Sequence, residues 1–258
     1  MSIDLEIIDS GIALLTINRP DKRNALDQEH YEGLSRAWQQ VRDDADIRVA
    51  VITGAGDKAF SAGADLKSFI PRRAPLADVW LTQQQPLLNR GLELYKPVIA
   101  AVNGYCLAGG MTLLLATDIR VAVPDATFSL AEVKRGIIAG NGGTQRCIAQ
   151  LPHAIAMELL LTGEAIDAKT AERWGLINKV VEREALLPAA LDSARRIAAN
   201  APLAVQACKE LALRAPELGL TAGLRMEQFV NRVLLGSSDA REGVQAFAEK
   251  RAPRFTGA

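Results

Sequence analysis

Short, β-branched apolar segments alternate with helical patterns along much of the chain, and this alternation limits the possible folds more than any other feature. Residues 48–53 (RVAVIT) and 98–102 (VIAAV) are the clearest of these segments. Continuous apolar runs of this length are typical of strands buried on both faces of a parallel sheet. The helical spacing of apolar residues over 27–44 directly precedes the first run. We therefore predict an α/β fold with mostly parallel strands covered by helices.

The N-terminal residues predict a hairpin, unlike the parallel strands predicted in the middle of the chain. Residues 3–18 are apolar on either side of an Asp-Ser-Gly turn at 9–11, which predicts a hairpin. The same reasoning from periodicity predicts a helix over 109–117 and short strands over 119–123 and 177–181.

Beyond about residue 185 the strand pattern disappears and only helical patterns remain. Breaks in these helices are expected at Pro202, Pro216, Gly219 and residues 237–238. No Pro/Gly/Ser-rich linker separates the two parts. We predict an α/β core over residues 1–195 and a helical C-terminal region over residues 196–258.

Composition excludes several classes of protein. The 258 residues include 30 Lys and Arg and 30 Asp and Glu, so no net charge attracts the chain to nucleic acid or to an anionic membrane. Apolar runs are far shorter than the roughly 20 residues of a membrane span. The acidic N-terminus does not resemble an import signal. These features predict a cytoplasmic enzyme or binding protein.

Cysteine and histidine offer little for catalysis or metal binding. The three cysteines have no CxxC spacing, which argues against a disulfide framework and a cysteine-bound zinc ion. Cys106 has no partner base nearby in the sequence, so a buried filler is the simpler interpretation than a nucleophile. His30 and His153, the only histidines, adjoin no candidate nucleophile or ligand set, so we expect no metal site and no Ser-His or Cys-His mechanism.

Two loops rich in glycine and alanine follow the buried strands, at residues 60–67 (FSAGADLK) and 103–111 (NGYCLAGGM). Small residues let a ligand approach the main chain, and the second loop opens a helix whose free N–H groups favour negative charge. Together the loops could bind an oxyanion, although glycines at such turns can also serve packing alone. Neither contains GxGxxG or GxxxxGK[ST], which argues against dinucleotide and P-loop sites. The glycines of 136–143 are expected to shape a pocket wall.

Carboxylates remain as the available acid-base groups, and Glu132 is the best placed. It follows a predicted strand and precedes the glycine-rich 136–143 segment. In an apolar pocket its pKa would be raised and it could transfer protons near neutral pH. The alternative is a solvated ion pair with the adjacent Lys134 or Arg135.

Six blocks in this order resemble the crotonase (enoyl-CoA hydratase/isomerase) superfamily over nearly the whole chain. They are INRPDKRNAL (17–26), ITGAGDKAFSAGADLK (52–67), KPVIAAVNGYCLAGGMTLLLATDIR (96–120), ATFSLAEVKRGIIAGNGGTQR (126–146), AMELLLTGEAIDAKTAERWGLINKVV (156–181) and DAREGVQAFAEKRAPRF (239–255). The resemblance implies a spiral of ββα repeats. It also implies a C-terminal α-helical region that builds homotrimers, often paired into hexamers.

The resemblance assigns roles to individual positions. The backbone N–H groups of Ala64 and Gly109 would hold the thioester oxygen of an acyl-CoA and stabilise the enolate, while Glu132 transfers protons. No cofactor is implied beyond the coenzyme A of the substrate. The residues expected to line the coenzyme A groove are Arg23, Ala25, Ala62, Asp65, Leu66 and Lys67, with Phe247 and Lys250 added by a neighbouring subunit.

One position departs from the two-glutamate hydratases of the family. Thr112 stands where their first glutamate is expected, and a hydroxyl can orient water but cannot accept its proton near neutral pH. Gly140 replaces the acid of dienoyl-CoA isomerases, while its N–H keeps the role of holding water.

Several reactions stay open after this departure. Hydratase/isomerase chemistry is the leading hypothesis. The alternatives are isomerisation alone, C–C cleavage of the hydroxycinnamoyl-CoA hydratase-lyase type, and non-catalytic binding of acyl-CoA or RNA. The segment 68–90 is expected to cover the pocket, and the sequence does not identify the acyl group.

Overall fold

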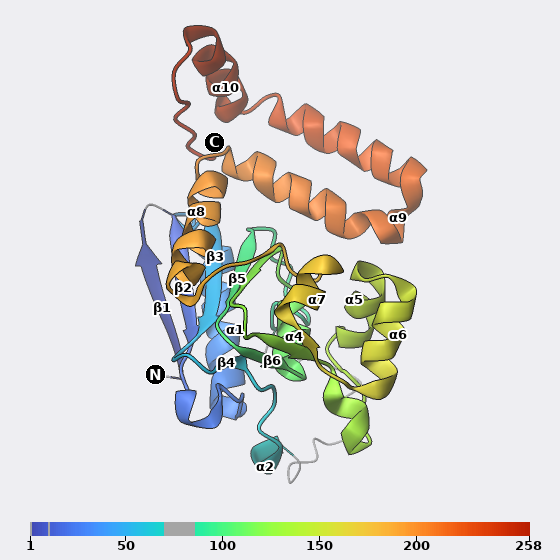
Figure 1. Cartoon of the computed structure of the whole chain (residues 1–258). Coiled ribbons are helices and arrows are strands. Elements are labelled where there is room, and N and C mark those ends of the chain that lie inside the picture. The colour runs from blue at the N-terminus through green and yellow to red at the C-terminus, as the bar shows by residue number, and fades with distance from the viewer. Residues whose placement is uncertain (1, 10, 70–85) are drawn as a thin grey trace.

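Two sheets form the framework of the core (Figure 1). The computed structural model describes residues 2–9, 11–69 and 86–258. Within these residues, the larger sheet is six-stranded and runs in the order β1 (Ile3–Ile8), β2 (Ile12–Ile17), β3 (Val49–Gly54), β5 (Val98–Val102), β7 (Ile119–Ala122) and β10 (Lys179–Val180). The smaller sheet has the order β4 (Ala59–Ser61), β6 (Tyr105–Leu107), β8 (Thr127–Ser129) and β9 (Ile166–Asp167).

The chain alternates between the two sheets as it advances. Strands β3, β5 and β7 pair in parallel in the large sheet, and each is followed by β4, β6 or β8, which pair in parallel in the small one. Helical segments then follow each of these short strands. The mostly parallel sheet and the spiral of ββα turns are thus confirmed, as is the antiparallel β1–β2 hairpin.

Helices cover the sheets and close the core. They are η1 (Pro20–Lys22), α1 (Gln28–Asp43), α2 (Leu66–Phe69), α4 (Gly109–Leu114), η2 (Ala131–Arg135), α5 (Gly143–Gln150), α6 (His153–Thr162), α7 (Ala168–Arg173), η3 (Arg183–Ala185), α8 (Leu186–Ala198), α9 (Pro202–Leu234) and α10 (Ser238–Glu249). Two predicted elements are shorter than expected, since α4 ends at Leu114 and β10 comprises two residues. No helix in the described part of the chain has the length and apolar character needed to cross a bilayer.

Helix α1 shows how the local sequence sets an element beside the site. Asp27 caps its first turn by accepting a hydrogen bond from the His30 N–H at 3.1 Å. Leu34, Trp38 and Val41 recur at helical spacing and are buried in the core, where α1 contacts β1 and β2 of the large sheet. This apolar face fixes the orientation of the helix.

Helices α9 and α10 form an arm that extends away from the core (Figure 1). The main apolar core ends at Ala198, and α9 contains no buried residue. Pro216 lies inside α9 and does not end it, contrary to the prediction. The break is at Gly219, whose φ of 66° and ψ of 162° leave the helical region. The division of the chain at residues 195 and 196 stays a prediction.

Candidate active site

A cavity of about 290 Å³ lies where α1, the loops around β4 and β6, η2 and the 137–141 segment meet. Its lining is mainly apolar, with a few polar groups. The residues that bound it are Leu26, Tyr31, Leu34, Trp38, Ala62, Ala64, Leu66, Leu87, Asn89, Leu107, Ala108, Gly109, Thr112, Leu113, Ala131, Glu132, Arg135, Ile137, Ile138, Gly140 and Asn141. Five residues predicted from the sequence to act in catalysis, Ala64, Gly109, Thr112, Glu132 and Gly140, are among them.

Two backbone amides adjoin at one side of this cavity. Gly63 approaches Gly109 so closely that a Cβ added at Gly63 would lie 2.6 Å from the Gly109 nitrogen. A Cβ added at Gly109 would lie 3.3 Å from the Ala64 nitrogen. Within the described residues, no hydrogen bond uses the Ala64 or Gly109 N–H as a donor. Both N–H groups are therefore available to a ligand at this cavity, and that they hold one oxygen together stays a prediction.

The first of these amides is positioned by a bridge between two chain segments. The Leu26 N–H donates to the Gly63 carbonyl at 2.8 Å, and the Asp65 N–H donates to the Leu26 carbonyl at 2.8 Å. Ala64 lies between these bonded groups, and its own N–H takes no part in the bridge. The bridge thus fixes the loop while leaving the amide available.

Buried hydrogen bonds also fix the segment that leads into the loop of Ala64. The Asn24 side chain donates to the carbonyls of Ala55 and Ala59 at 3.0 and 2.6 Å and accepts from the Arg19 N–H at 2.9 Å. Ser61 donates to the Asn24 carbonyl at 2.8 Å, and its hydroxyl accepts from the Gly63 N–H at 3.1 Å. These bonds satisfy polar groups that burial would otherwise leave unpaired.

The second amide depends on a strained residue. Ala108 precedes α4 with φ of 49° and ψ of −119°, a conformation that residues with a Cβ rarely adopt. This conformation places Gly109 at the first position of α4, where the N–H has no partner within the helix. Strain of this kind costs on the order of 1–3 kcal/mol and is typical of functional loops.

Glu132 brings the only carboxyl group among the described residues that bound the cavity. It lies in η2 and is 9% exposed, and its Oε2 has no hydrogen-bond partner among the described residues. Burial raises the pKa of this carboxyl, and the charge of Arg135 partly opposes the shift. Lys134 instead pairs with Glu164 at 2.7 Å. The alternative of a solvated ion pair at Glu132 is therefore wrong.

Thr112 and Gly140 complete the polar edge of the cavity. Thr112 lies in α4 and is 2% exposed. A Cβ added at Gly143 would lie 2.8 Å from its hydroxyl oxygen, so the start of α5 packs closely on this threonine. Gly140 is in the exposed segment before α5.

The predicted coenzyme A residues of the first half of the chain gather beside the cavity. Ala62 and Leu66 line it, while Lys67 is exposed in α2. Arg23 is exposed, with its guanidinium 5.4 Å from the centre of the Tyr105 ring.

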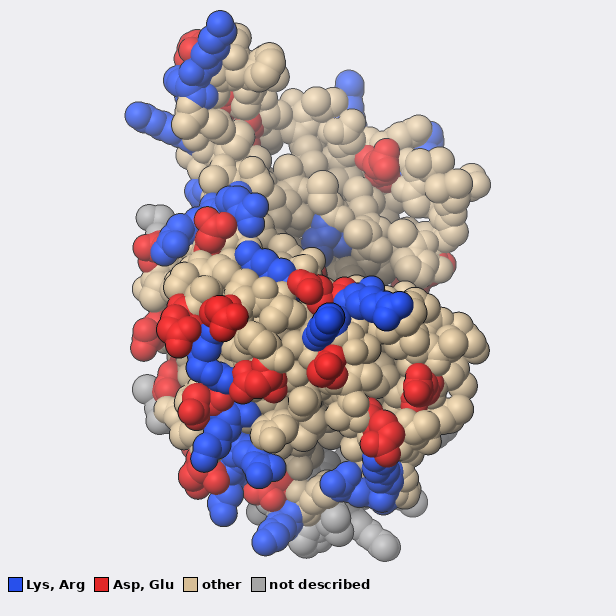
Figure 2. Space-filling view, in the orientation of Figure 1, with Lys and Arg blue, Asp and Glu red and all other residues tan. Residues whose placement is uncertain are grey.

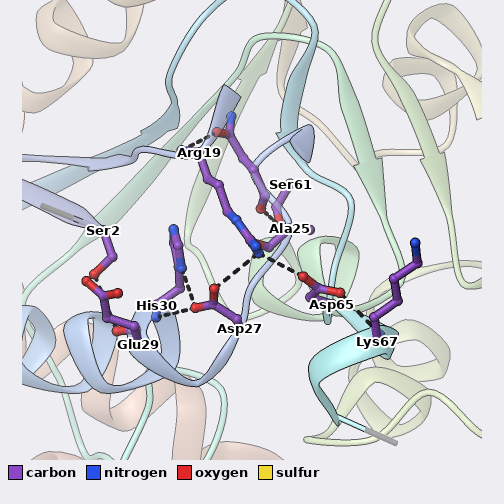
Figure 3. Close-up of polar contacts among 10 residues, drawn as sticks. Ser2, Arg19, Ala25, Asp27, Glu29, His30, Ser61, Asp65 and Lys67 are labelled. Atoms are coloured by element: carbon purple, nitrogen blue, oxygen red, sulfur yellow. Dashed lines mark hydrogen bonds and ion pairs between the residues drawn. The ribbon is translucent and has the colours of Figure 1, made fainter. Parts of the chain in front are cut away.

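Asp65 is already engaged in an ion-pair network (Figure 3). Arg19 lies between two carboxylates, 3.0 Å from Asp65 and 3.2 Å from Asp27, and also donates to the Ala25 carbonyl. Asp27 in turn contacts the His30 Nδ1 at 2.6 Å. The network ties the start of α1 to the loop that carries Ala64, and the predicted place of Asp65 in the coenzyme A groove stays a prediction.

Phe247 and Lys250 are far from this cavity within one chain. They belong to the arm at the opposite end of the molecule from α2 (Figure 1), and Phe247 is 87% exposed. Their predicted contribution requires a second copy and stays a prediction. Of the segment 68–90 expected to cover the pocket, residues 70–85 lie outside the described residues. Leu87 and Asn89 line the cavity.

The sequence did not reveal that α1 forms one wall of the cavity. Tyr31, Leu34 and Trp38 line the cavity. Their helical spacing predicted only a buried face, because a face that packs on a core and one that borders a pocket have the same periodicity. The phenol of Tyr31 is the one signal that could have singled out this wall.

The spiral of ββα turns and the amide-lined pocket with one buried carboxyl define an enzyme of the crotonase superfamily. A family model described as enoyl-CoA hydratase/isomerase matches residues 7–258. The chain is 43% identical over 258 residues to (E)-benzylidenesuccinyl-CoA hydratase from Thauera aromatica, covering 100% of both chains. It is 41% identical over 264 residues to carnitinyl-CoA dehydratase from Salmonella typhi, again covering 100% of both.

Solved structures that resemble this chain support the same family. Enoyl-CoA hydratase EchA1 from Mycobacterium marinum superposes with a TM-score of 0.92 at 39% identity, covering 100% of this chain and 99% of that one. Enoyl-CoA hydratase from Mycobacterium tuberculosis H37Rv gives 0.90 at 39% identity with the same coverage. The chain belongs to the enoyl-CoA hydratase/isomerase family.

Proposed function

We propose that this enzyme catalyses the reversible hydration of an enoyl-CoA thioester, with Glu132 as its single proton shuttle. The observation that carries the proposal is the buried Oε2 of Glu132, which has no partner among the described residues and lies in the same cavity as the amides of Ala64 and Gly109. The two relatives compared above are named as a hydratase and a dehydratase of CoA thioesters, which supports this direction of chemistry.

The steps follow from these groups. Glu132 takes a proton from water as the water oxygen bonds to the β-carbon, and the electrons of the double bond move onto the thioester oxygen. The Ala64 and Gly109 N–H groups stabilise the resulting enolate. The protonated Glu132 then gives its proton to the α-carbon and the carbonyl re-forms. Thr112 and Gly140 would orient the water, and reversal of these steps gives dehydration.

The second candidate is double-bond isomerisation without hydration. Glu132 is the only carboxyl that the described residues bring to the cavity, and one carboxyl is enough to move a proton between two carbons. Assays of the purified enzyme with crotonyl-CoA and with a 3-enoyl-CoA separate the two. We expect hydration of crotonyl-CoA, and Thr112→Val should lower hydration about tenfold or more while sparing isomerisation. Isomerisation with no hydration would overturn the proposal in favour of the second candidate.

Two further alternatives have their own readouts. Release of an aldehyde from a hydroxycinnamoyl-CoA would show C–C cleavage. Binding of CoA thioesters without turnover of any would show a non-catalytic binding protein.

The burial of Glu132 predicts the pH dependence of the reaction. The carboxyl must be ionised to accept a proton from water, and burial raises its pKa above the ordinary 4.5. We expect kcat/KM for hydration to fall on the acid side with an apparent pKa above that value. Initial rates across the acidic and neutral range check this, and an acid limb at or below 4.5 would contradict the assignment.

We also propose that substrate binding extends over the predicted coenzyme A groove and needs a second copy of the chain. The arm carries exposed apolar side chains, with Leu220 78% and Val233 76% exposed. In Figure 2 the surface over α9 is mostly uncharged, whereas the core carries many charged side chains, both basic (Lys and Arg) and acidic (Asp and Glu). Such faces are typical of protein interfaces. A homotrimer or hexamer would bring Phe247 and Lys250 to a neighbouring cavity, and light scattering would measure the mass.

A further inference from the structure

Tyr31 places a phenol hydroxyl at the amide pair. A Cβ added at Gly109 would meet the Tyr31 hydroxyl oxygen at 3.5 Å and the Ala64 nitrogen at 3.3 Å, so the phenol and both amides border one point. The hydroxyl lies within about 6 Å of the Gly109 nitrogen, given standard backbone geometry. Two donors that each lie about 2.9 Å from one shared acceptor oxygen are at most about 5.8 Å apart, which this arrangement permits.

The environment of Tyr31 keeps its proton in place. Burial raises the pKa of Tyr31 to about 12, with the charge of Glu132 acting in the same direction and that of Arg90 against it. The phenol is therefore neutral at physiological pH and acts as a donor rather than as a base. Its hydroxyl does not bond to the Glu132 Oε2, which has no partner among the described residues.

From this arrangement we infer that Tyr31 is a catalytic residue whose hydroxyl donates a third hydrogen bond to the thioester oxygen. The inference rests on the proposed function, because that oxygen becomes negatively charged only if the reaction passes through an enolate. A third donor would strengthen the hold on this charge. A third donor would be useful in an enzyme that has Thr112 in place of a second carboxyl. A more stable enolate lowers the barrier that Glu132, as the remaining acid-base group, has to overcome.

The step involves no transfer of the phenol proton. The electrons of the double bond move onto the thioester oxygen as in the proposed mechanism, and the Tyr31 hydroxyl keeps its proton while hydrogen-bonding that oxygen. An interaction that strengthens as charge develops lowers the barrier more than it tightens substrate binding.

Tyr31→Phe removes only the hydroxyl and leaves the ring in the cavity wall. We expect kcat for hydration and kcat for isomerisation to fall together by about tenfold to a hundredfold. This loss is smaller than the loss of one donor from a site with only two donors, because here the two amides remain. KM should change little. The matched control is Tyr95→Phe, since the Tyr95 hydroxyl contacts Arg214 at 2.6 Å and does not border the cavity. A change in KM alone would indicate a structural role and overturn the inference.

A second measurement does not depend on turnover. Butyryl-CoA labelled with ¹³C at the thioester carbonyl is saturated and cannot be hydrated, and hydrogen bonding lowers its carbonyl stretching frequency. Infrared difference spectra should show a downward shift on binding to the wild type and a smaller shift with Tyr31→Phe.

The outcomes separate the inference from the proposed function. Equal infrared shifts in the wild type and Tyr31→Phe would overturn the inference, even if crotonyl-CoA is hydrated. If Tyr31→Phe loses hydration but not isomerisation and its infrared band equals that of the wild type, the Tyr31 hydroxyl acts on the oxygen of the attacking water. That result would also overturn the inference. If the shift depends on Tyr31 but no thioester reacts, the hydrogen bond from Tyr31 to the thioester oxygen stands, while the proposed reaction and the catalytic role of Tyr31 in it fail.

Discussion

Replacing Glu132 with glutamine is expected to lower kcat for hydration by about a hundred- to ten-thousandfold, because the amide can neither accept the proton of water nor return it to carbon. The fold should be retained, since glutamine has the same shape and Oε2 of Glu132 has no partner to lose among the described residues. Steady-state rates with crotonyl-CoA test this. The matched control is Glu158→Gln, an exposed carboxylate of α6 outside the cavity, which should leave the rate unchanged.

Stability provides an independent readout of the same variant. Below the ordinary pKa of glutamic acid, the carboxyl is protonated in both the folded and the unfolded chain and carries no penalty. As pH rises through the raised pKa of Glu132, only the folded chain must hold a buried charge, so the wild type loses stability relative to Glu132→Gln. The variant should therefore have the higher free energy of unfolding at neutral pH, with the difference vanishing in acid. Undiminished activity, or a variant less stable at neutral pH, would contradict the assignment.

Gly63→Ala is expected to lower kcat/KM by about a hundred- to a thousandfold, the loss typical of removing one oxyanion donor. The added Cβ would lie 2.6 Å from the Gly109 nitrogen and 2.9 Å from the Leu107 carbonyl, so the backbone must shift. Gly63 also has φ of 84°, which alanine adopts with strain. The two amides would then no longer point at one oxygen.

A graded pair of variants separates this effect from general damage. At Gly109 an added Cβ meets the Ala64 nitrogen at 3.3 Å, so Gly109→Ala needs a smaller shift and should lose less activity than Gly63→Ala. The Cβ of Gly223→Ala in α9 would meet no atom of the described residues within 4 Å, so this variant serves as the control. Circular dichroism and thermal unfolding establish that each variant folds. Full activity in Gly63→Ala would argue against the amide pair as the oxygen site.

The long-range organisation of the core could be predicted where strands are long enough to show a pattern. Residues 98–102 coincide with β5, and the helix predicted over 27–44 contains α1. The strands of the small sheet escaped prediction from periodicity because each has only two or three residues. A run of that length has no measurable period, and its position is fixed by pairing with segments far along the chain.

Burial and the orientation of side chains could not be predicted from local sequence. Glu132 is followed by Lys134 and Arg135, which suggests a solvated surface, yet the 3₁₀ turn of η2 directs its carboxyl inward and leaves Lys134 to pair with Glu164. Tyr31 was expected only to pack on the core. Its closeness to Gly109 depends on how α1 crosses the small-sheet loops, which the spacing of apolar residues does not encode.

The apolar side chains of α1 that line the cavity and the backbone amides beside them come from separate segments of the chain. Leu34 and Trp38 lie on α1, which also carries Tyr31, whereas the two amides and the Glu132 carboxyl come from the turns after β4, β6 and β8. Exchanging Leu34 or Trp38 for larger or smaller side chains would therefore change the space available to an acyl group without moving the two amides proposed to hold the thioester oxygen.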